Sequence, residues 1–257
     1  MNFDMEKKLL IVPDVHGRPF WKKIQDYPDI PVVFLGDYLD PYDFDGVTPE
    51  MALDAFKELL EYVKTRDNCT MLYGNHDLSY AVGKQICQCR TNHKDYDEIR
   101  KLFWENKPFY FSYYYEGKNK KFVFTHAGLT KDWIDATPNL FANRSVDEVL
   151  TKWKYFNDLD KRHSELLYRY LSDISSKRGG WKPFGSLVWA DVAEHFHKAE
   201  KETEYVQVFG HSYSKCAIKS TCEYDWYMLD CKQVFYIDED DNIRYLDSDK
   251  LVDEYLP

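Results

Sequence analysis

The sequence predicts an α/β fold in which two β-sheets pack face to face as a sandwich, with α-helices on the outside. Short apolar runs that end abruptly in polar clusters are spread along the chain. A stretch with helical periodicity separates the second run from the third, and the last part of the chain returns to short strands. Strand, helix and strand in this order predict right-handed crossovers and strands that end at one edge of a sheet.

Two buried strands begin the chain. Residues 8–12, which are apolar from residue 9 on, are read as a strand stopped by Pro13, and residues 32–35 are read as a second strand closed by Gly36 and Asp37. Continuous apolar runs of this length, bounded by turn residues, are typical of strands buried on both faces.

A helix and a third strand follow. Residues 49–66 have helical periodicity, with a proline at the first turn and basic residues at the end, which predicts a helix. Residues 70–73 then form a strand that leads into Gly74 and Asn75, and residues 94–107 have the pattern of a second helix.

The middle of the chain predicts a hairpin and then a helical region. Residues 109–115 and 121–125 are strand-like and are joined by a polar turn at 116–120. Residues 129–200 are mainly helical in pattern, with a loop at 179–185, and we interpret this segment as a lid over one side of the fold. With no internal repeat and no linker, residues 1–257 are expected to form a single domain.

The C-terminal part predicts a second sheet. Its apolar runs are joined by short acidic turns, and they lie at 205–209, 226–229, 234–237 and 243–246. The acidic run 238–241 lacks the spacing of a calcium-binding loop and is read as a hairpin turn. A two-sheet sandwich accounts for both halves of the chain.

Composition limits the function. The 257 residues are 44% hydrophobic, which is enough for a substantial core, and the formal net charge is −10. A strongly acidic chain is not expected to bind nucleic acid or an anionic membrane. The N-terminal apolar run is too short for a signal peptide or a membrane span, so we expect a cytoplasmic protein. The sequence does not indicate an oligomeric state.

The cysteines and several histidines do not suggest sites of their own. No cysteine pair has a C-x-x-C spacing, so all six are read as reduced thiols: Cys69, Cys87, Cys89, Cys216, Cys222 and Cys231. His195 and His197 form H-x-H without a partner cluster, and we expect them on a solvated surface. His93 and His163 are also expected to be exposed.

Five polar clusters follow predicted strands. Each offers Asp, Asn or His beside a glycine or a strand end, where tight turns bring side chains together: 13–17, 36–40, 74–77, 125–128 and 210–212. Taken alone, any one of them is more often a turn or a cap than a metal site. Together they supply six candidate ligands for divalent metals: Asp14, His16, Asp37, Asn75, His126 and His211.

The ligand types fit two metals that share one carboxylate. Asp14 and His16 are two residues apart, so on an extended segment they face the same way, and Asp37 is the candidate bridge. Two metals carry four positive charges and the two aspartates remove two, leaving roughly +2 to attract phosphate. Such a centre lowers the pKa of bound water from about 15.7 towards about 7.

An acid for the leaving alkoxide is still needed. His76 directly follows the ligand Asn75, and Asp40 is placed to keep it protonated. We assign His76 as general acid and Asp40 as its orienting partner. The alternative is that His76 only orients a ligand and Asp40 is a cap.

The ordered set D-x-H-G, G-D-x-x-D, G-N-H-D, H-A-G and G-H, from residue 13 to 212, resembles the calcineurin-like metallophosphoesterase superfamily. The resemblance implies a metallophosphoesterase-like sandwich with α-β-β-α layers and a dinuclear centre holding Mn, Fe or Zn, of which we expect Mn. Within the superfamily the chain is most similar to serine/threonine phosphoprotein phosphatases and their bacterial relatives, including diadenosine tetraphosphatases. Residues 187–191 and 229–231 also resemble that branch.

The resemblance has departures that bear on the substrate. Pro41 stands where protein phosphatases carry a phosphate-binding arginine, and Arg18 and Arg144 are the candidates to replace it. We therefore expect a phosphorylated substrate: a phosphomonoester, a phosphoprotein or a dinucleoside polyphosphate. A phosphodiesterase or nuclease on the same centre is the alternative, although Tyr213 stands where many of those branches carry a second histidine. A non-catalytic scaffold is disfavoured because every expected ligand is retained.

Overall fold

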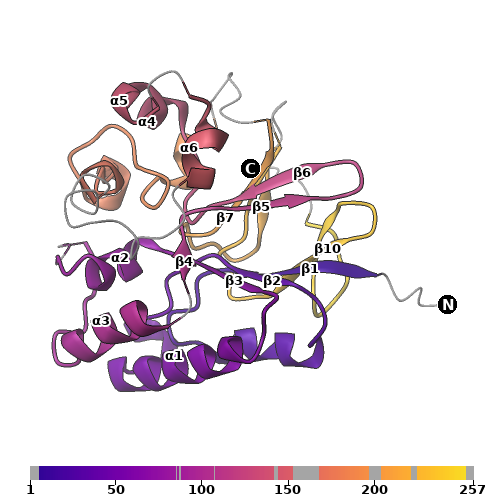
Figure 1. Cartoon of the computed structure of the whole chain (residues 1–257), viewed down its shortest axis with the longest axis horizontal. Helices are drawn as coiled ribbons and strands as arrows, with labels where there is room; N and C mark the ends of the chain where they lie inside the picture. Colours follow the sequence, from indigo (N-terminus) through magenta and orange to yellow (C-terminus); the bar gives the residue numbers. More distant parts are fainter. Residues whose placement is uncertain are drawn as a thin grey trace.

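The structure is a computed structural model that describes residues 6–84, 86, 88–106, 108–141, 144–152, 168–196, 204–220 and 225–252. Figure 1 shows two β-sheets with helices α1 and α3 below the first sheet and helices α4, α5 and α6 on the far side of the molecule. The predicted α/β sandwich flanked by helices is confirmed.

The first sheet contains both ends of the described chain. Its strand order is β11-β10-β1-β2-β3-β4, and β1 to β4 run parallel to one another. The C-terminal strand β10 pairs antiparallel with β1. The strands are β1 (Lys7–Val12), β2 (Val32–Phe34), β3 (Cys69–Leu72), β4 (Phe109–Tyr110), β10 (Phe235–Asp238) and β11 (Ile243–Tyr245).

The second sheet has the order β5-β6-β7-β9-β8. Strands β5 and β6 form an antiparallel hairpin, and β6, β7 and β9 are parallel. The strands are β5 (Tyr113–Glu116), β6 (Lys121–Phe124), β7 (Val206–Phe209), β8 (Ile218–Lys219) and β9 (Trp226–Met228). The carboxyl ends of the parallel strands in both sheets therefore supply the turns that carry polar side chains.

Successive side chains of β1 point to opposite faces of the sheet, and both faces are buried. Leu10 and Val12 pack towards helix α1 in one hydrophobic cluster, whereas Leu9 and Ile11 pack between the two sheets in another. A strand with both faces buried needs apolar residues at every position.

Helix α1 has the capping residue and the proline that commonly mark the beginning of a helix. Helix α1 is capped by Thr48, whose hydroxyl accepts the Met51 N–H, and begins at Pro49. Short 3₁₀ helices lie at Pro19–Asp26, Asp43–Asp45, Ser176–Arg178 and Val192–Glu194. The α-helices are α1 (Pro49–Lys64), α2 (Asn75–Ala81), α3 (Tyr96–Glu105), α4 (Lys131–Ala136), α5 (Pro138–Phe141) and α6 (Val146–Lys152).

Three sequence-based expectations change. The strands at 235–238 and 243–245 join the first sheet and not the second, because β10 pairs with β1. The expected strand at 109–115 is two strands, one in each sheet. The segment 129–200 is helical only in part, since the stretch 173–196 contains no helix longer than a 3₁₀ turn, and 153–167 and 197–200 lie outside the described residues.

None of the helices in the described ranges is long and apolar enough to cross a membrane. The four cysteines that the structure describes, Cys69, Cys89, Cys216 and Cys231, are free thiols. Cys87 and Cys222 lie outside the described residues.

Candidate metal centre

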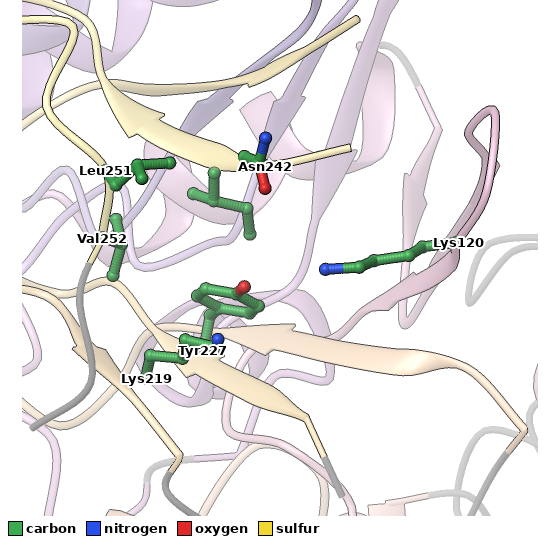
Figure 2. Close-up of a pocket in the computed structure, with 7 residues that line it drawn as sticks. Lys120, Lys219, Tyr227, Asn242, Leu251 and Val252 are labelled. Carbon is green, nitrogen blue, oxygen red and sulfur yellow. The ribbon is translucent and has the colours of Figure 1, made fainter. Parts of the chain in front are cut away.

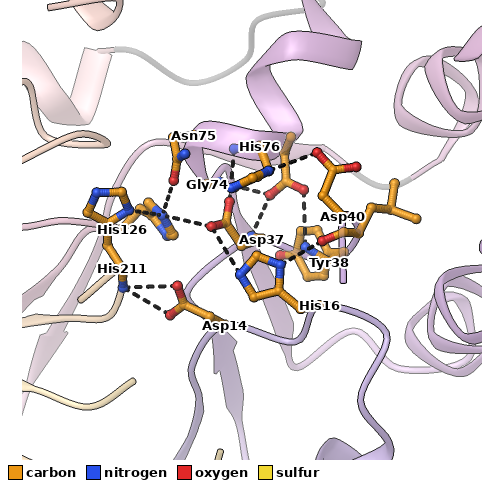
Figure 3. Close-up of polar contacts among 12 residues, drawn as sticks. Asp14, His16, Asp37, Tyr38, Asp40, Gly74, Asn75, His76, His126 and His211 are labelled. Carbon is orange, nitrogen blue, oxygen red and sulfur yellow. Dashed lines mark hydrogen bonds and ion pairs between the residues drawn. The ribbon is translucent and has the colours of Figure 1, made fainter. Parts of the chain in front are cut away.

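The predicted ligands converge where the strands end. Asp14 follows β1, Asp37 follows β2 and Asn75 follows β3 as the first residue of α2. His126 follows β6 and His211 follows β7, so these two come from the second sheet. Figure 3 shows that the side chains from both sheets point towards one another, with Asp37 in their midst.

Asp37 belongs to two groups of possible ligands. One group is Asp14, His16 and Asp37, and the other is Asp37, His126 and His211; in each, the donor atoms lie within 4.8 Å of one another. Oδ2 of Asp37 is 3.6 Å from Nε2 of His16 and 3.4 Å from Nε2 of His126. All five residues are buried.

Atoms that could bind a metal lie close to one ring nitrogen of His126. Its Nε2 lies 2.9 Å from the amide oxygen of Asn75 and 3.2 Å from Nδ1 of His211. Imidazole nitrogens, a carboxylate oxygen and an amide oxygen that share a buried space are the donor set that divalent metals bind in proteins.

The other ring nitrogens fix the orientation of two imidazoles. Nδ1 of His126 donates to the Leu35 carbonyl at 2.8 Å, and Nδ1 of His16 donates to the Leu39 carbonyl at 2.7 Å. Because a carbonyl only accepts, Nδ1 carries a proton in both rings, and Nε2, which faces Asp37, is the nitrogen available to a metal. Nε2 of His211 is also buried and has no hydrogen-bond partner among the described residues. These residues fit a bound metal.

Burial and mutual charge set the protonation of the cluster. Burial raises the pKa of Asp14 to about 6 and lowers the pKa of His16 to about 3. Burial opposes a charged His126, but the carboxylates of Asp37 and Asp14 outweigh it and raise its pKa to about 9. For Asp37 the neighbouring His126 and His76 outweigh burial and hold its pKa well below the usual range.

One carboxylate joins two of the turns that carry ligands. Asp77 accepts the backbone N–H groups of Asp37 at 2.7 Å, Tyr38 at 3.1 Å and Gly74 at 2.8 Å. The turns also interlock, since a Cβ on Gly36 would meet the Gly74 nitrogen at 2.3 Å. Asp77, which the sequence did not single out for a role, thus holds the turn of Asp37 against that of Asn75.

Backbone strain is concentrated at this centre. The φ angles of His16 (46°), Asp37 (53°), Asp40 (57°) and His211 (66°) are all positive. Non-glycine residues rarely adopt this conformation, and such residues cluster at functional sites. The chain therefore turns at His16 and is not extended there as the sequence argument assumed, although the side chains of Asp14 and His16 still reach Asp37.

His76 lies beside the ligands and is held by Asp40. Its Nδ1 is 2.8 Å from Oδ2 of Asp40, and the other oxygen of Asp40 accepts the hydroxyl of Tyr80. Burial disfavours the charged ring, but Cys89, Asp37 and the hydrogen bond to Asp40 outweigh burial and raise the pKa of His76 well above its ordinary value. The ring of His76 lies 5.3 Å from that of His16.

A cavity of about 180 Å³ opens over these residues, and two arginines line it. Arg90 donates to the carbonyls of Asp40 and Pro41, with its guanidinium 3.5 Å from the centre of the Tyr42 ring. Arg178 pairs with Asp191 and donates to the Ser212 hydroxyl. The lining residues are Asp37, Tyr42, Asn75, His76, Gln88, Arg90, Arg178, Trp189 and His211.

Neither arginine suggested by the sequence lines this cavity. Arg18 is buried against Asp45, with Nε 2.8 Å from that carboxylate, and Arg144 donates to the carbonyl of Leu140. Arg90 and Arg178 were missed because each stands outside the motifs and no local pattern marks it.

The remaining histidines are partly as expected. His93 is exposed. His195 is not on a solvated surface: it is 3% exposed, stacks on Phe209 and donates to the Ala127 carbonyl. The expectation was wrong because an H-x-H pair in a polar segment does not reveal tertiary packing. His163 and His197 lie outside the described residues.

A larger cavity, of about 440 Å³, lies elsewhere between the sheets. Figure 2 shows Lys120 and the ring of Tyr227 facing it. Its lining residues are Lys120, Lys219, Tyr227, Asn242, Ile243, Leu251 and Val252, which include no carboxylate, imidazole or thiol. The smaller cavity over Asp37 therefore holds the groups able to do chemistry.

The two-sheet fold carries a buried cluster of side chains that could bind divalent metals. A family model described as calcineurin-like phosphoesterase matches residues 7–227, and the chain belongs to this family. The family depends on divalent metals, and the chain is a phosphatase-like hydrolase with residues able to bind them. No curated protein matches the sequence.

Two of the similar solved structures share the fold at low sequence identity, and a third aligns less closely. A cold-active protein-tyrosine phosphatase from a psychrophilic Shewanella species is 14% identical with a TM-score of 0.59, over 96% of this chain and 80% of that one. A second structure of a cold-active protein-tyrosine phosphatase is 14% identical with a TM-score of 0.54, over 93% and 78%. A protein serine/threonine phosphatase from Saccharomyces cerevisiae is 12% identical with a TM-score of 0.49, over 100% and 82%.

Proposed function

We propose that the protein hydrolyses phosphate monoesters with a centre of two divalent metal ions. The observation that carries the proposal is that Asp37 is shared by two groups of ligands, with Oδ2 of its carboxylate 3.6 Å from Nε2 of His16 and 3.4 Å from Nε2 of His126. Asp14 and His16 would hold one ion, and Asn75, His126 and His211 would hold the other. We propose Mn²⁺, with Fe and Zn as alternatives.

Bound ions would supply two things, activation of water as a nucleophile and neutralisation of charge on the phosphate. The chain's own contribution is to orient the ligands. The hydrogen bonds to the Leu35 and Leu39 carbonyls support this, because they hold the Nε2 atoms of His126 and His16 towards Asp37.

His76 is proposed to give its proton to the leaving oxygen of the ester. Support comes from its place in the wall of the cavity and from its hydrogen bond to Asp40. Asp40 in turn is held by the Tyr80 hydroxyl, so the His76 ring has a fixed orientation. A proton delivered to the departing alkoxide removes the need to expel it as an anion.

Arg90 and Arg178 are proposed to bind the non-reacting phosphate oxygens. Both guanidinium groups line the cavity, and guanidinium forks match the geometry of phosphate. They would replace the arginine that Pro41 displaces. Arg178 comes from the segment 129–200, so this segment contributes to the wall of the cavity.

The substrate class is proposed to be a phosphomonoester, a phosphoprotein or a dinucleoside polyphosphate. Within this class, the small volume of the cavity favours a phosphomonoester or a phosphoprotein, whose phosphate is terminal, over a dinucleoside polyphosphate or another substrate with internal phosphates, because an internal phosphate needs room on both sides of phosphorus. Net charge of −10 also disfavours a nuclease.

The test is a comparison of two model substrates. Purified protein with Mn²⁺ is expected to hydrolyse p-nitrophenyl phosphate and to act much more slowly on bis-p-nitrophenyl phosphate. Faster cleavage of the diester would favour a phosphodiesterase. Absence of turnover on both, together with no transition metal by elemental analysis, would support a non-catalytic scaffold.

A further inference from the structure

A row of aromatic rings leads out of the cavity. The ring of Tyr42, which lines the cavity, lies 5.0 Å from the ring of His16. Phe44 stacks on Tyr42 at 5.1 Å with the planes 22° apart, and Tyr213 lies 6.3 Å from Phe44. We call Tyr42, Phe44 and Tyr213 the aromatic ledge.

The outer rings of the aromatic ledge are open to solvent. Phe44 is 67% exposed and Tyr213 is 49% exposed, which makes them two of the few exposed large apolar side chains in the described part of the chain. A pair of exposed aromatic residues beside a catalytic cavity is typical of a ligand-binding surface.

A lysine holds the two exposed rings in place. The ammonium group of Lys232 lies 4.8 Å from the centre of the Phe44 ring and 5.0 Å from that of Tyr213, and it forms an ion pair with Asp45. A cation above ring faces is attracted to them. The rings are therefore positioned before a ligand arrives, and a positive charge stands beside them.

The cavity is too small to hold a large substrate. Its volume is about 180 Å³, and pockets that enclose whole small-molecule ligands hold roughly 300–1,000 Å³. A phosphate and the group next to it can enter. The rest of the substrate has to lie outside, and the Tyr42 wall of the cavity leads directly to Phe44.

Resting on the proposed function, we infer that the substrate is a nucleoside phosphate whose base stacks on Phe44 and Tyr213 while its phosphate occupies the cavity. A ring bonded directly to the ester oxygen would lie beside Tyr42 and would not reach the exposed rings. In a nucleoside phosphate, the sugar lies between the phosphate and the base. The sugar would therefore lie beside Tyr42, and the base would lie beside the exposed rings of Phe44 and Tyr213.

The charge of the chain favours a small nucleotide over a polymer. A net charge of −10 opposes the binding of a nucleic acid backbone, which depends on neutralising many phosphates. The aromatic ledge needs only one base, because every base offers a flat face for stacking.

The experiment measures binding apart from turnover. Non-hydrolysable phosphonate analogues of adenosine 5′-monophosphate, of ribose 5-phosphate and of tyrosine phosphate are titrated calorimetrically into the Mn²⁺-loaded protein. The variants are Phe44→Ala, Tyr213→Ala and Tyr213→Phe, with Trp104→Ala as the control. Trp104 is an exposed aromatic residue on α3 and does not line the cavity.

The adenosine analogue is expected to bind about tenfold more tightly than the ribose analogue. Phe44→Ala and Tyr213→Ala should each remove most of this preference, whereas Tyr213→Phe and Trp104→Ala should retain it. Equal binding of the two analogues, or a preference that survives both alanine variants, would overturn the inference. If the two alanine variants lose more affinity for the tyrosine phosphate analogue than for the adenosine analogue, the inference is wrong and an aryl ester is favoured as the substrate.

Turnover of ribose 5-phosphate by the unaltered protein tests the proposed function by itself. If ribose 5-phosphate is hydrolysed and the analogues show no base preference, only the inference fails. If no phosphate ester is hydrolysed, the proposed function fails whatever the calorimetry shows.

Discussion

Nδ1 of His76 lies 2.8 Å from Oδ2 of Asp40, and both side chains are buried beside the candidate metal ligands. This pairing fixes the ring of His76 and directs its Nε2 away from Asp40.

His76→Asn is expected to lower kcat by roughly 10²–10⁴-fold, because the leaving oxygen loses its proton donor. Metal content, measured by elemental analysis, should stay at the level of the unaltered protein. Asp40→Asn should lower kcat less, since His76 remains but is less well held. The exposed His93→Ala is the matched control. Full activity in His76→Asn would show that His76 is not the acid.

Asp37→Asn is expected to lose most of its bound metal and its turnover. The carboxylate is shared by both groups of ligands, so its loss weakens both. Unaltered protein should bind about two ions per chain after dialysis against Mn²⁺, and chelation followed by re-addition of Mn²⁺ should abolish and restore activity. Asp43→Asn, at an exposed position, is the control. A single ion in the unaltered protein would contradict a dinuclear centre.

Metal uptake is expected to release protons. The pKa of His126 is raised from 6.5 to about 9 in the metal-free chain, so its ring holds a proton below that pH and a metal must displace it. The pKa of His16 is lowered to about 3, so that ring is already neutral. Apparent metal affinity should therefore rise from pH 6.5 to pH 9.

Calorimetry in buffers of different ionisation enthalpy measures this release. The same pKa makes a prediction for stability: the protonated His126 stabilises the metal-free fold fully below pH 6.5, and this contribution disappears as the pH rises through about 9. A metal affinity that does not change over this range would show that His126 does not bind the metal.

Asp77→Ala is expected to lower the free energy of unfolding by about 2 kcal/mol or more, because three buried backbone N–H groups lose their acceptor. Urea denaturation measures the change. Asp29→Ala, at an exposed position, should change stability by less than about 0.5 kcal/mol. Equal effects of the two substitutions would mean that the Asp77 carboxylate does not hold the turns together.

Arg90→Ala and Arg178→Ala are each expected to raise KM for a phosphomonoester by about tenfold or more, because a charge-assisted hydrogen bond to phosphate contributes about 1.5–3 kcal/mol. Steady-state kinetics with inorganic phosphate as a competing inhibitor separates binding from chemistry. Arg144→Ala, which removes an arginine that does not line the cavity, should leave KM unchanged. An unchanged KM in both cavity variants would reject the assignment.

Much of the fold could be predicted because strands that are buried on both faces appear in the sequence as short, continuous apolar runs. Residues 9–12 are apolar at every position for that reason, and the stretch 8–12 was recognised as a buried strand. The pattern of apolar residues and the positions of turns do not reveal which strands pair with one another. For this reason, β10 and β11 were placed in the wrong sheet. Helix α2 was missed because buried polar residues lie among its apolar ones, so its sequence shows no apolar stripe with a helical period.

The candidate site could be located because its residues follow strands in a regular order. Motif spacing carried information on Asp14, Asp37 and Asn75, whose turns all lie at the carboxyl ends of parallel strands. Motif spacing carried no information on Arg90 or Arg178, because the conformation of their loops brings these two residues to the cavity. The rings of Phe44 and Tyr213 are likewise brought together by two loops far apart in sequence.

The pairing of β10 with β1 has a consequence for biosynthesis. Strand β1 waits for the synthesis of residues 235–238 before its second edge is covered, although β2 and β3 can pair with one another much earlier. An open apolar edge invites pairing with other chains. A chain cut after residue 227, where the family match ends, would retain every candidate ligand yet leave β1 uncovered, and we expect it to aggregate during expression.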